Sequence, residues 1–383
     1  MIDIKDKSMC CGCGACAQIC PTSSIDMAED EEGFLYPRVN LSKCIHCSKC
    51  ETTCPVLNSA IEPDLKKDCY ACFSTDDDIR LNSSSGGIFS LVALKVLGEG
   101  GIVYGAAFDG DYSVHHIRID QRGQLSKIQK SKYLQSRTED IFVQVKADLQ
   151  QGKKVLYSGT ACQIAGLKHF LGRDFENLIT VDVLCHGVPS PKIWKMYLQY
   201  ALGEKVKSIH SINFRDKKWG WKDFSLEILY DSNRSLLEQH RSNTYMDLFL
   251  SDLILRPSCY HCKFKSLDRC SDLTLGDAWG IDKTLPEMDD DKGTSILLIH
   301  TDKGREYVNG FADRMKMESA LIDSILPPDS DSRKSVTAHP RRARFFQLAK
   351  TDGKKAFRYW KRYRCISAVK NKVKQIWKRI LHV

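Results

Sequence analysis

Short apolar runs alternate with helix-like segments along the middle of the chain. Two segments, at 89–97 and 139–150, carry apolar residues at helical spacing. The apolar runs are each bounded by polar or turn-forming residues, which favours buried strands. These runs are CYACFS (69–74), GIVYGAAF (101–108), KVLYSG (154–159) and LITVDVLC (178–185). Strands that alternate with helices predict an α/β sheet with helices on both faces.

The pattern changes on either side of this segment. Residues 1–60 lack long periodic segments, and IEPDLKKD (61–68) predicts a polar linker. Residues 205–325 mix irregular segments with strand-like runs, at 206–214, 224–230 and 294–301. The chain is therefore predicted to have four parts, at 1–60, 69–200, 201–330 and 341–383.

The C-terminal part has a third pattern, in which apolar residues recur every three or four positions between Lys and Arg. They are Phe357, Trp360, Ile366, Val369, Val373, Ile376, Trp377 and Ile380. This predicts a basic amphipathic helix.

The net charge of the chain is +9, and residues 341–383 contribute +14, which leaves −5 for residues 1–340. The tail is expected to bind an anionic membrane surface or an acidic protein partner, or else to fold back on the acidic body. No nucleic-acid recognition motif occurs, so no nucleic-acid partner is expected.

Composition and length suggest a soluble protein of 383 residues with two or three domains, since 42% of the residues are hydrophobic and 27% are charged. No run of eighteen apolar residues occurs, and MIDIKDK lacks the apolar core of a secretory signal. A cytoplasmic location is expected, membrane-peripheral if the tail binds lipid. In a reducing compartment, seventeen cysteines at short spacings indicate metal ligands rather than disulfides.

One cysteine pattern occurs twice near the N-terminus, as C-x2-C-x2-C-x3-C-P. The first copy contains Cys10, Cys13, Cys16 and Cys20, and the second contains Cys44, Cys47, Cys50 and Cys54. This is the frame of bacterial two-cluster ferredoxins, in which the fourth cysteine of each copy ligates the other cluster. We therefore predict one [4Fe–4S] cluster on Cys10, Cys13, Cys16 and Cys54, and a second on Cys44, Cys47, Cys50 and Cys20. Zinc or inert thiols are the alternatives, and Cys11 falls outside the frame.

Other cysteines have less distinctive spacing. Cys69 and Cys72 lie on a predicted strand and are expected to be buried thiols on opposite faces. A possible further metal site consists of Cys162, Cys185, Cys259 and Cys262, with Cys270 close to it in the sequence. Buried, unligated cysteines are an equally good interpretation of this set.

The chain has neither G-x-G-x-x-G after a strand nor G-x-x-x-x-G-K-[ST], so the common dinucleotide and phosphate loops are not supported. NSSSGGIFSLVALKVL (82–97) instead places hydroxyl residues and two glycines before a helix. Such a loop can bind phosphate through N–H groups and the positive end of the helix, although Ser-Gly loops are also common turns.

Several motifs occur in order after the cysteine-rich head. They are SSSGGIFS (83–90), SKYLQS (131–136), GTACQIAGLKHFL (159–171), DVLCHGVPSP (182–191), NFRDKKWGW (213–221), RPSCYHCKF (256–264) and LGDAWGI (275–281). Together they resemble the coenzyme F-420 hydrogenase/dehydrogenase β-subunit family over residues 8–300. The resemblance implies that residues 69–200 and 201–330 are the N-terminal and C-terminal parts of one family domain. The resemblance implies a bacterial-type 2[4Fe–4S] ferredoxin domain, an α/β flavin-binding domain and FAD as cofactor, here followed by the basic C-terminal helix.

The resemblance also implies which residues form the flavin pocket. They are Ser85, Gly86, Gly87, Lys132, Gly159, Gln163, His186 and Gly187. Ala278 stands where the family usually has an aromatic residue, and it would remove a bulky wall if it faced the pocket.

His186 is the candidate proton donor, since histidine titrates near neutrality, and the alternative is a structural hydrogen bond to backbone. Arg215 could hold a phosphate or carboxylate, or form a structural ion pair.

The predicted activity is that of an oxidoreductase. Electrons would pass between a ferredoxin-like or deazaflavin partner and a small-molecule acceptor through two [4Fe–4S] clusters and FAD, with coenzyme F-420 a candidate substrate. The alternatives are a non-catalytic electron-transfer subunit of a larger complex, and a protein that keeps the clusters for structure.

Overall fold

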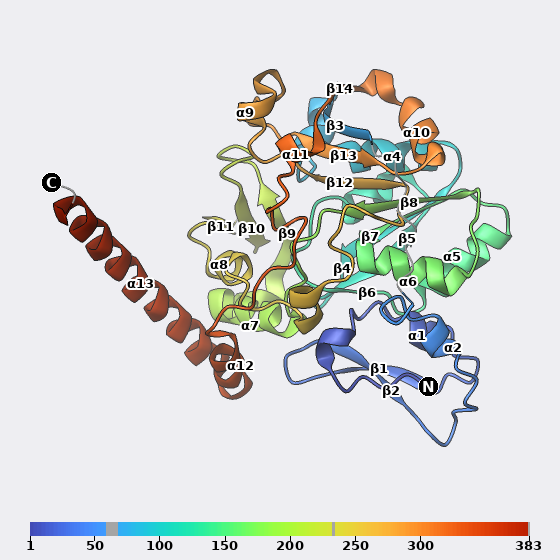
Figure 1. The fold of residues 1–383 in the computed structure, drawn as a ribbon, viewed down its shortest axis with the longest axis horizontal. Helices are drawn as coiled ribbons and strands as arrows, with labels where there is room; N and C mark the ends of the chain where they lie inside the picture. Colours follow the sequence, from blue (N-terminus) through green and yellow to red (C-terminus); the bar gives the residue numbers. More distant parts are fainter. Residues whose placement is uncertain (59–67, 232–233, 382–383) are drawn as a thin grey trace.

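A nine-stranded sheet forms the centre of the molecule (Figure 1). The computed structural model describes residues 1–58, 68–231 and 234–381, with side chains up to residue 370, so most of the predicted linker at 61–68 lies outside the described residues. The strand order is β14-β3-β13-β12-β8-β7-β4-β5-β6. The strands are β3 (Asp68–Ser74), β4 (Ile102–Phe108), β5 (Val114–Ile119), β6 (Ser136–Arg137), β7 (Val155–Thr160), β8 (Leu178–Val183), β12 (Leu273–Asp277), β13 (Ser295–Ile299) and β14 (Met315–Ser319).

Parallel strands occupy the middle of this sheet. β12, β8, β7 and β4 run parallel, and antiparallel strands continue the sheet from β12 through β13 and from β4 through β5. In the register, Val183 is the partner of both Thr160 and Leu275. The carboxyl ends of β7, β8 and β12 therefore meet at one edge of the sheet, where α/β folds commonly bind ligands.

Helices cover both faces of the sheet. α4 (Ile88–Gly98) packs on one face, and α5 (Ile141–Gln150) and α6 (Ala161–Leu171) pack on the other. The side chains of β4 alternate accordingly, because Val103 belongs to the core on the α4 side and Tyr104 to the core on the α6 side. The prediction of a mixed α/β fold with helices on both faces is confirmed.

A second layer lies beside the carboxyl edge of the sheet. It contains a three-stranded antiparallel sheet of β9 (Ile209–Asp216), β10 (Ser225–Tyr230) and β11 (Arg234–Gln239). α7 (Pro191–Leu202) and α8 (Thr244–Leu250) pack with it around the aromatic side chains of Trp194, Phe214 and Tyr245. Four shorter helices are α3 (Asp77–Leu81), α9 (Ile281–Thr284), α10 (Asp302–Asn309) and α11 (Ile322–Ile325).

The cysteine-rich N-terminal region lies under one end of this body (Figure 1). Its elements are α1 (Ala15–Gln18), β1 (Ile25–Glu29), β2 (Leu35–Val39) and α2 (Lys49–Thr52). α1 packs on α6 at Gly166, where an added Cβ would lie 2.9 Å from the Cys13 Sγ atom. A glycine is needed at this point because the helix backbone approaches the cysteine loop so closely.

Two helices end the chain. α12 (Arg342–Thr351) and the first turns of α13 (Gly353–Leu381) pack on the second layer, whereas the rest of α13 projects away from the body (Figure 1). None of the helices in the described ranges is long and apolar enough to cross a membrane.

Candidate functional site

Two cavities in the N-terminal region are each lined by four of the predicted ligand cysteines. Cys10, Cys13, Cys16 and Cys54 line the first cysteine cavity, together with Cys11. Cys20, Cys44, Cys47 and Cys50 line the second cysteine cavity. The fourth cysteine of each copy thus lies with the first three of the other copy, which is the grouping that the spacing predicts.

Left-handed backbone at matching positions curls both cysteine loops. Gly12 and Gly14 have φ values of +72° and +76°, and the equivalent residues of the second copy, His46 and Ser48, have +54° and +58°. A short helix follows each loop, α1 in one copy and α2 in the other. The two copies therefore share one backbone shape. Only the first copy has glycine at these positions, and glycine adopts left-handed backbone without the steric cost that a side chain imposes.

Hydrogen bonds and neighbouring thiols act on the cysteine sulfurs. Burial would raise the pKa of the Cys20 thiol, but hydrogen bonds from Ser24 and Thr22 outweigh it and lower the pKa to about 7. Burial raises the pKa of Cys16 to about 12, and the nearby thiols of Cys10 and Cys54 add to the effect. Such donors and crowded thiols suit an iron–sulfur cluster, whose sulfurs accept N–H and O–H groups.

A third cysteine cavity lies between the first one and the body. Its wall includes the sulfur-bearing residues Cys11, Cys162, Cys185, Cys259 and Cys262. Cys162 stands in the first turn of α6, Cys185 follows the end of β8, and Cys259 lies on the 3₁₀ turn Pro257–His261. The predicted further set thus comes together from three distant segments. Cys270 instead packs in an apolar cluster with Val56 and Phe264.

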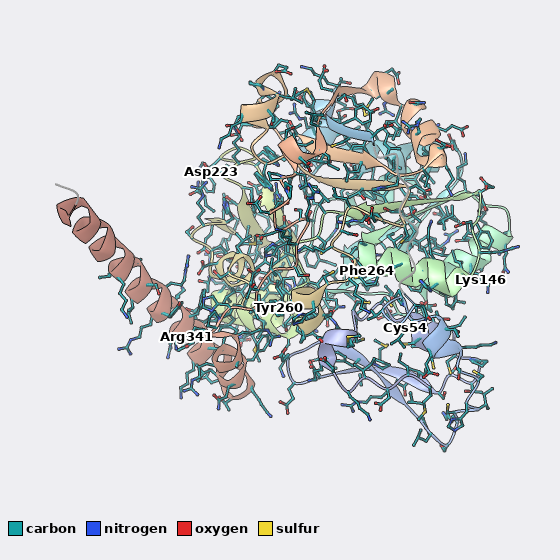
Figure 2. All side chains as sticks on the ribbon, in the orientation of Figure 1. Cys54, Lys146, Asp223, Tyr260, Phe264 and Arg341 are labelled. Atoms are coloured by element: carbon teal, nitrogen blue, oxygen red, sulfur yellow. The ribbon has the colours of Figure 1, made fainter. Side chains whose placement is uncertain are left out.

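The cysteine side chains line the walls of these cavities and do not converge on one point. Among residues 1–58, 68–231 and 234–381, no three His, Cys, Asp or Glu side chains are grouped tightly enough to hold a single metal ion. Phe264 lines the third cavity and belongs to an apolar cluster against which Cys54 also packs (Figure 2). In the third cavity, the N–H of Val188 donates to the Cys259 Sγ atom at 3.4 Å.

Arg256 connects the body to the first cysteine loop. Its guanidinium is fully buried and donates to the carbonyl oxygens of Cys10 (2.7 Å) and Leu35 (2.8 Å), and to the Oε1 atom of Gln135 (2.9 Å). One of its nitrogens also lies 3.5 Å from the Cys10 Sγ atom. Sequence reasoning missed this residue, because nothing in the pattern links it to a cysteine 246 positions away.

A large cavity of about 790 Å³ opens at the carboxyl ends of β7, β8 and β12. Seven of the eight predicted flavin residues line it, namely Ser85, Gly87, Lys132, Gly159, Gln163, His186 and Gly187. Gly86 does not line this cavity. Its N–H donates to the Ser295 Oγ atom at 2.9 Å, and an added Cβ would lie 2.5 Å from the Cys72 carbonyl oxygen. The glycine is needed for packing against the sheet, and we correct its predicted contact with a ligand.

The large cavity shares walls with the third cysteine cavity. Cys162, Cys185 and His186 line both, and Cys11 lines these two and the first cysteine cavity. Cys11 also touches Cys162, and its carbonyl oxygen accepts from Gln135. The residue outside the predicted ferredoxin frame thus stands where three cavities meet.

Two predicted residues of the large cavity have local structural partners. Gln163 and Thr160 form a capping box at the start of α6, with the Thr160 N–H donating to Gln163 Oε1 at 3.0 Å. The Lys132 ammonium donates to the carbonyl oxygens of Gln129 (2.6 Å) and Lys127 (3.2 Å). Burial lowers the pKa of Lys132 to about 7. A phosphate beside it would favour the charged form.

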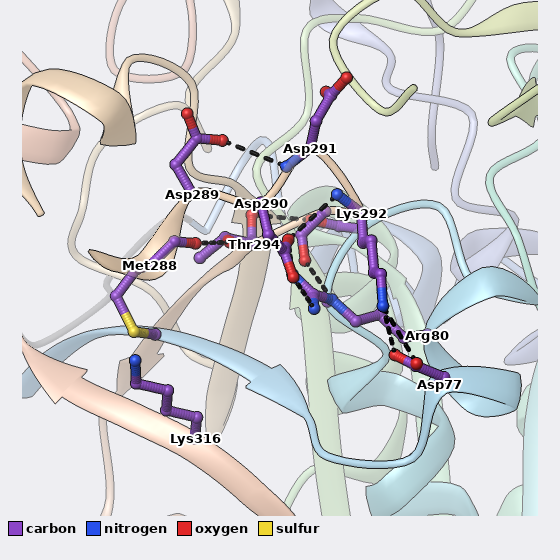
Figure 3. A network of polar contacts seen from close by, with 12 residues as sticks. Asp77, Arg80, Met288, Asp289, Asp290, Asp291, Lys292, Thr294 and Lys316 are labelled. Carbon is purple, nitrogen blue, oxygen red and sulfur yellow. Dashed lines mark hydrogen bonds and ion pairs between the residues drawn. The ribbon is translucent and has the colours of Figure 1, made fainter. Parts of the chain in front are cut away.

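Ion pairs behind the cavity wall fix the Ser83–Gly87 loop. Arg80 forms a bidentate pair with Asp290 and donates to the carbonyl oxygen of Gly293 at 2.9 Å (Figure 3). Lys292 pairs with Asp77 on the outer side of the same network (Figure 3). The loop at 289–292 therefore clamps α3, so that the serine–glycine turn that follows α3 is held in one place.

His186 has a polar partner on the wall between the two cavities. Its Nε2 atom lies 2.7 Å from the Asp252 Oδ1 atom, and its ring packs edge-on against Phe249. The histidine is therefore oriented by a carboxylate, as in many proton-transfer sites, and not by backbone alone.

The far end of the large cavity is cationic and aromatic. Arg215 forms an ion pair with Asp277 (2.7 Å), so the structural-pair alternative describes it, although its buried Nε atom has no partner. Ala278 is fully buried in another core and does not line the cavity. The adjacent Trp279 does, stacked on Trp221 at 4.5 Å and 47% exposed, so the cavity has an aromatic wall although residue 278 is alanine.

Two family descriptions match parts of the chain. Residues 152–324 match the C terminus of the beta subunit of coenzyme F420 hydrogenase/dehydrogenase, and residues 9–58 match the 4Fe–4S dicluster domain. Among curated proteins, an uncharacterized polyferredoxin-like protein and an uncharacterized ferredoxin of Methanocaldococcus jannaschii are similar to it. They are 33% identical over 60 residues and 34% identical over 66 residues, which is 14% and 16% of this chain. The matches span 36% of the first relative and 84% of the second.

A solved structure is also similar in part. It is a chain of the xenon-derivatized F420-reducing [NiFe] hydrogenase complex from Methanosarcina barkeri, at 18% identity and a TM-score of 0.46. The match covers 78% of this chain and 93% of that chain.

Proposed function

Because the chain belongs to the coenzyme F420 hydrogenase/dehydrogenase β-subunit family, through residues 152–324, and carries a 4Fe–4S dicluster domain at residues 9–58, we propose that it is an iron–sulfur flavoprotein oxidoreductase. Electrons would move between a ferredoxin-like or deazaflavin partner and an organic acceptor. The observation that carries the proposal is that the first cysteine cavity, the third cysteine cavity and the large cavity share wall residues, and that the large cavity has room for a cofactor.

The N-terminal cysteines would hold two [4Fe–4S] clusters. The first uses Cys10, Cys13, Cys16 and Cys54, and the second uses Cys20, Cys44, Cys47 and Cys50. When bound, these clusters supply one-electron transfer. The chain orients the thiolates through its two left-handed loops, and the backbone N–H of Ile2 donates to the Cys50 Sγ atom at 3.2 Å.

A third cluster is proposed for Cys162, Cys185, Cys259 and Cys262. Four cysteines around one space are the complement of a cubane, and the Lys265 and Arg269 side chains in the same wall would offset its negative charge. The location also supports the assignment, because Cys11 separates this cavity from the first one and Cys162 separates it from the large cavity.

FAD is proposed for the large cavity. A volume of about 790 Å³ lies within the range of cofactor and ligand sites. Lys132 and the serine–glycine turn before α4 offer a cation, hydroxyl groups and a helix N-terminus to a phosphate. A bound flavin accepts electrons singly and delivers them as a pair, which reduction of an organic bond requires.

His186 is proposed to donate the proton to the acceptor. Asp252 holds its Nε2 atom, so the imidazole keeps one orientation on the cavity wall. The acceptor would lie toward Trp279, whose partly exposed ring on the cavity wall suits stacking on a planar group. Coenzyme F420 is one candidate of this kind.

Anaerobic purification with iron, sulfide and flavin analysis tests the proposal. We expect about twelve irons and one flavin per chain, and reduction of the flavin by dithionite followed by reoxidation by a small acceptor. A Cys162→Ala variant should lose about four irons, whereas Cys270→Ala, at a cysteine outside the cavity wall, should lose none. Clusters without flavin, in a protein that copurifies with a larger complex, would instead support the alternative of a non-catalytic electron-transfer subunit.

A further inference from the structure

The long C-terminal helix α13 has two halves in different surroundings. In the first half, the Phe357 and Trp360 side chains are each 1% exposed. The Phe357 ring lies 4.9 Å from the Tyr200 ring, and the Trp360 Nε1 atom donates to the Asp247 Oδ2 atom at 2.7 Å. These contacts fix the base of the helix to α7 and α8, so its direction relative to the body is set.

The apolar residues continue where contact with the body ends. Ile366 is 46% exposed and Val369 is 62% exposed. They continue the spacing of three positions between Phe357, Trp360 and Tyr363. Because an α-helix has 3.6 residues per turn, apolar residues placed every three positions form a stripe that winds gradually around the helix. The stripe therefore leaves the face that contacts the body. In the sequence, apolar residues follow at 373, 376, 377 and 380.

The charges on this helix have one sign. Residues 353–381 contain eleven Lys or Arg and no Asp or Glu. Lys370, in the part that projects, is exposed, and so is Arg362 on the half that contacts the body. Residues 1–340 sum to −5, so an anionic surface would attract the helix and repel the rest of the chain.

We propose that the projecting half of α13 binds the interface of an anionic membrane. Its apolar stripe would enter the boundary between headgroups and acyl chains, while Lys and Arg would lie at the level of the lipid phosphates. The first half would act as a rigid arm, which keeps the net-negative body off the lipid. The inference does not depend on the proposed redox activity, since it rests on the tail alone.

Sedimentation of the purified full-length protein with vesicles tests this proposal. We expect binding to vesicles of phosphatidylcholine with phosphatidylglycerol, no binding to phosphatidylcholine alone, and weaker binding as salt is raised. The double variant I366D/V369D should lower the partition coefficient about tenfold, because two apolar side chains of the stripe become charged. Leu321→Asp, at another exposed apolar residue on the body, is the matched control and should bind like the unchanged protein.

Three results would overturn the proposal. The first is equal binding to neutral and anionic vesicles, which would mean that the cations do not act. The second is unchanged binding by I366D/V369D with a normal circular dichroism spectrum, which would mean that neither the apolar stripe nor the charge of the projecting half contributes to binding. The third is a lipid-independent dimer that this double variant dissociates, since the stripe would then bind a second copy of the chain.

Discussion

The two cysteine loops of the N-terminal region have the same backbone but different surroundings. Gly12 and His46 occupy equivalent left-handed positions, and so do Gly14 and Ser48. In the first loop, Cys11 to Ala15 are buried or half-buried against the body. In the second, Ile45 to Lys49 are exposed, and the Ile45 side chain is 62% exposed.

This difference indicates a direction. The first loop adjoins the third cysteine cavity through Cys11 and touches Arg256 of the body, whereas the second loop borders solvent. An external electron partner can therefore approach the second loop, while the first loop leads toward the large cavity. Repetition of one motif has produced an outer and an inner site, and the distinction comes from what packs on each loop.

The largest effect should come from the fourth cysteines, because each should act on the site of the other loop. We expect Cys54→Ser to remove the inner cluster and Cys20→Ser to remove the outer one, each with a loss of about four irons per chain. Iron analysis and electron paramagnetic resonance of the reduced protein would measure this. Cys365→Ser, at an exposed cysteine on α13, is the control. Loss of the outer signal in Cys54→Ser would show that the loops do not exchange ligands.

A second prediction concerns the contact that makes the first loop the inner one. Arg256→Met would leave the carbonyl oxygens of Cys10 and Leu35 and the amide of Gln135 without a buried donor. We expect the free energy of unfolding to fall by about 3 kcal/mol in denaturant titrations.

Arg256→Met should also lower the reduction potential of the inner cluster, because a cation near the Cys10 sulfur favours the reduced, more negative form. The potential of the outer cluster should stay the same, which provides an internal control in one titration. Equal shifts of both potentials would contradict the division into inner and outer sites.

Much of the sheet could be predicted from local pattern. The apolar runs at 69–74, 101–108, 154–159 and 178–185 correspond to β3, β4, β7 and β8, and Cys69 and Cys72 are buried in different cores, as expected. β5 and β12 were not predicted. β5 is interrupted by His115 and His116, and β12 is five residues long with a glycine. Burial by neighbouring strands, which no local pattern contains, makes both of them strands.

The candidate site shows a similar division. The ferredoxin cysteines could be grouped because three ligands of each cluster lie in one short loop, and the two-cluster frame assigns the fourth to the other copy. The large cavity combines segments more than 100 positions apart, and its contacts could not be predicted from local pattern. Arg256 was not identified as a contact of the first loop, Gly86 was predicted in the pocket but packs on β13, and Trp279, which lines the cavity, was not predicted. Which side chain of a loop faces a cavity depends on tertiary contacts, and the local sequence pattern does not contain them.

A third prediction compares equivalent positions of the two loops. Gly12→Ala would place a Cβ at a φ of +72°, 2.6 Å from the Gln135 Nε2 atom and 2.7 Å from an Arg256 nitrogen. We expect it to destabilise the protein by about 2 kcal/mol. His46→Ala keeps a Cβ at an exposed position that already tolerates one, so its effect should be within about 0.5 kcal/mol. Thermal unfolding of both variants measures the contrast, and equal effects would mean that the body does not press on the first loop.

The smallest expected effect lies at the far end of the inner path, where Lys132 faces the large cavity. Its pKa of about 7 means that the ammonium is charged below neutrality and loses its charge as the pH rises. If FAD phosphate binds there, the dissociation constant should rise about tenfold between pH 6 and pH 8.5, since charge is lost on the protein side of the contact.

The stability of the flavin-free protein should change in the opposite sense. The unfolded lysine titrates near 10.5, so between pH 7 and about 10 the unfolded chain binds more protons than the folded one, and the free energy of unfolding rises with pH.

Fluorescence titration with FAD measures the binding by itself, apart from the change in stability. Lys132→Met should weaken binding and abolish its dependence on pH, whereas Lys132→Arg, which stays charged, should bind equally at both pH values. A pH dependence that persists in Lys132→Met would assign the titrating group elsewhere. Dithionite reduction of the outer cluster should follow neither profile, because Lys132 lies beyond the inner loop and the third cavity.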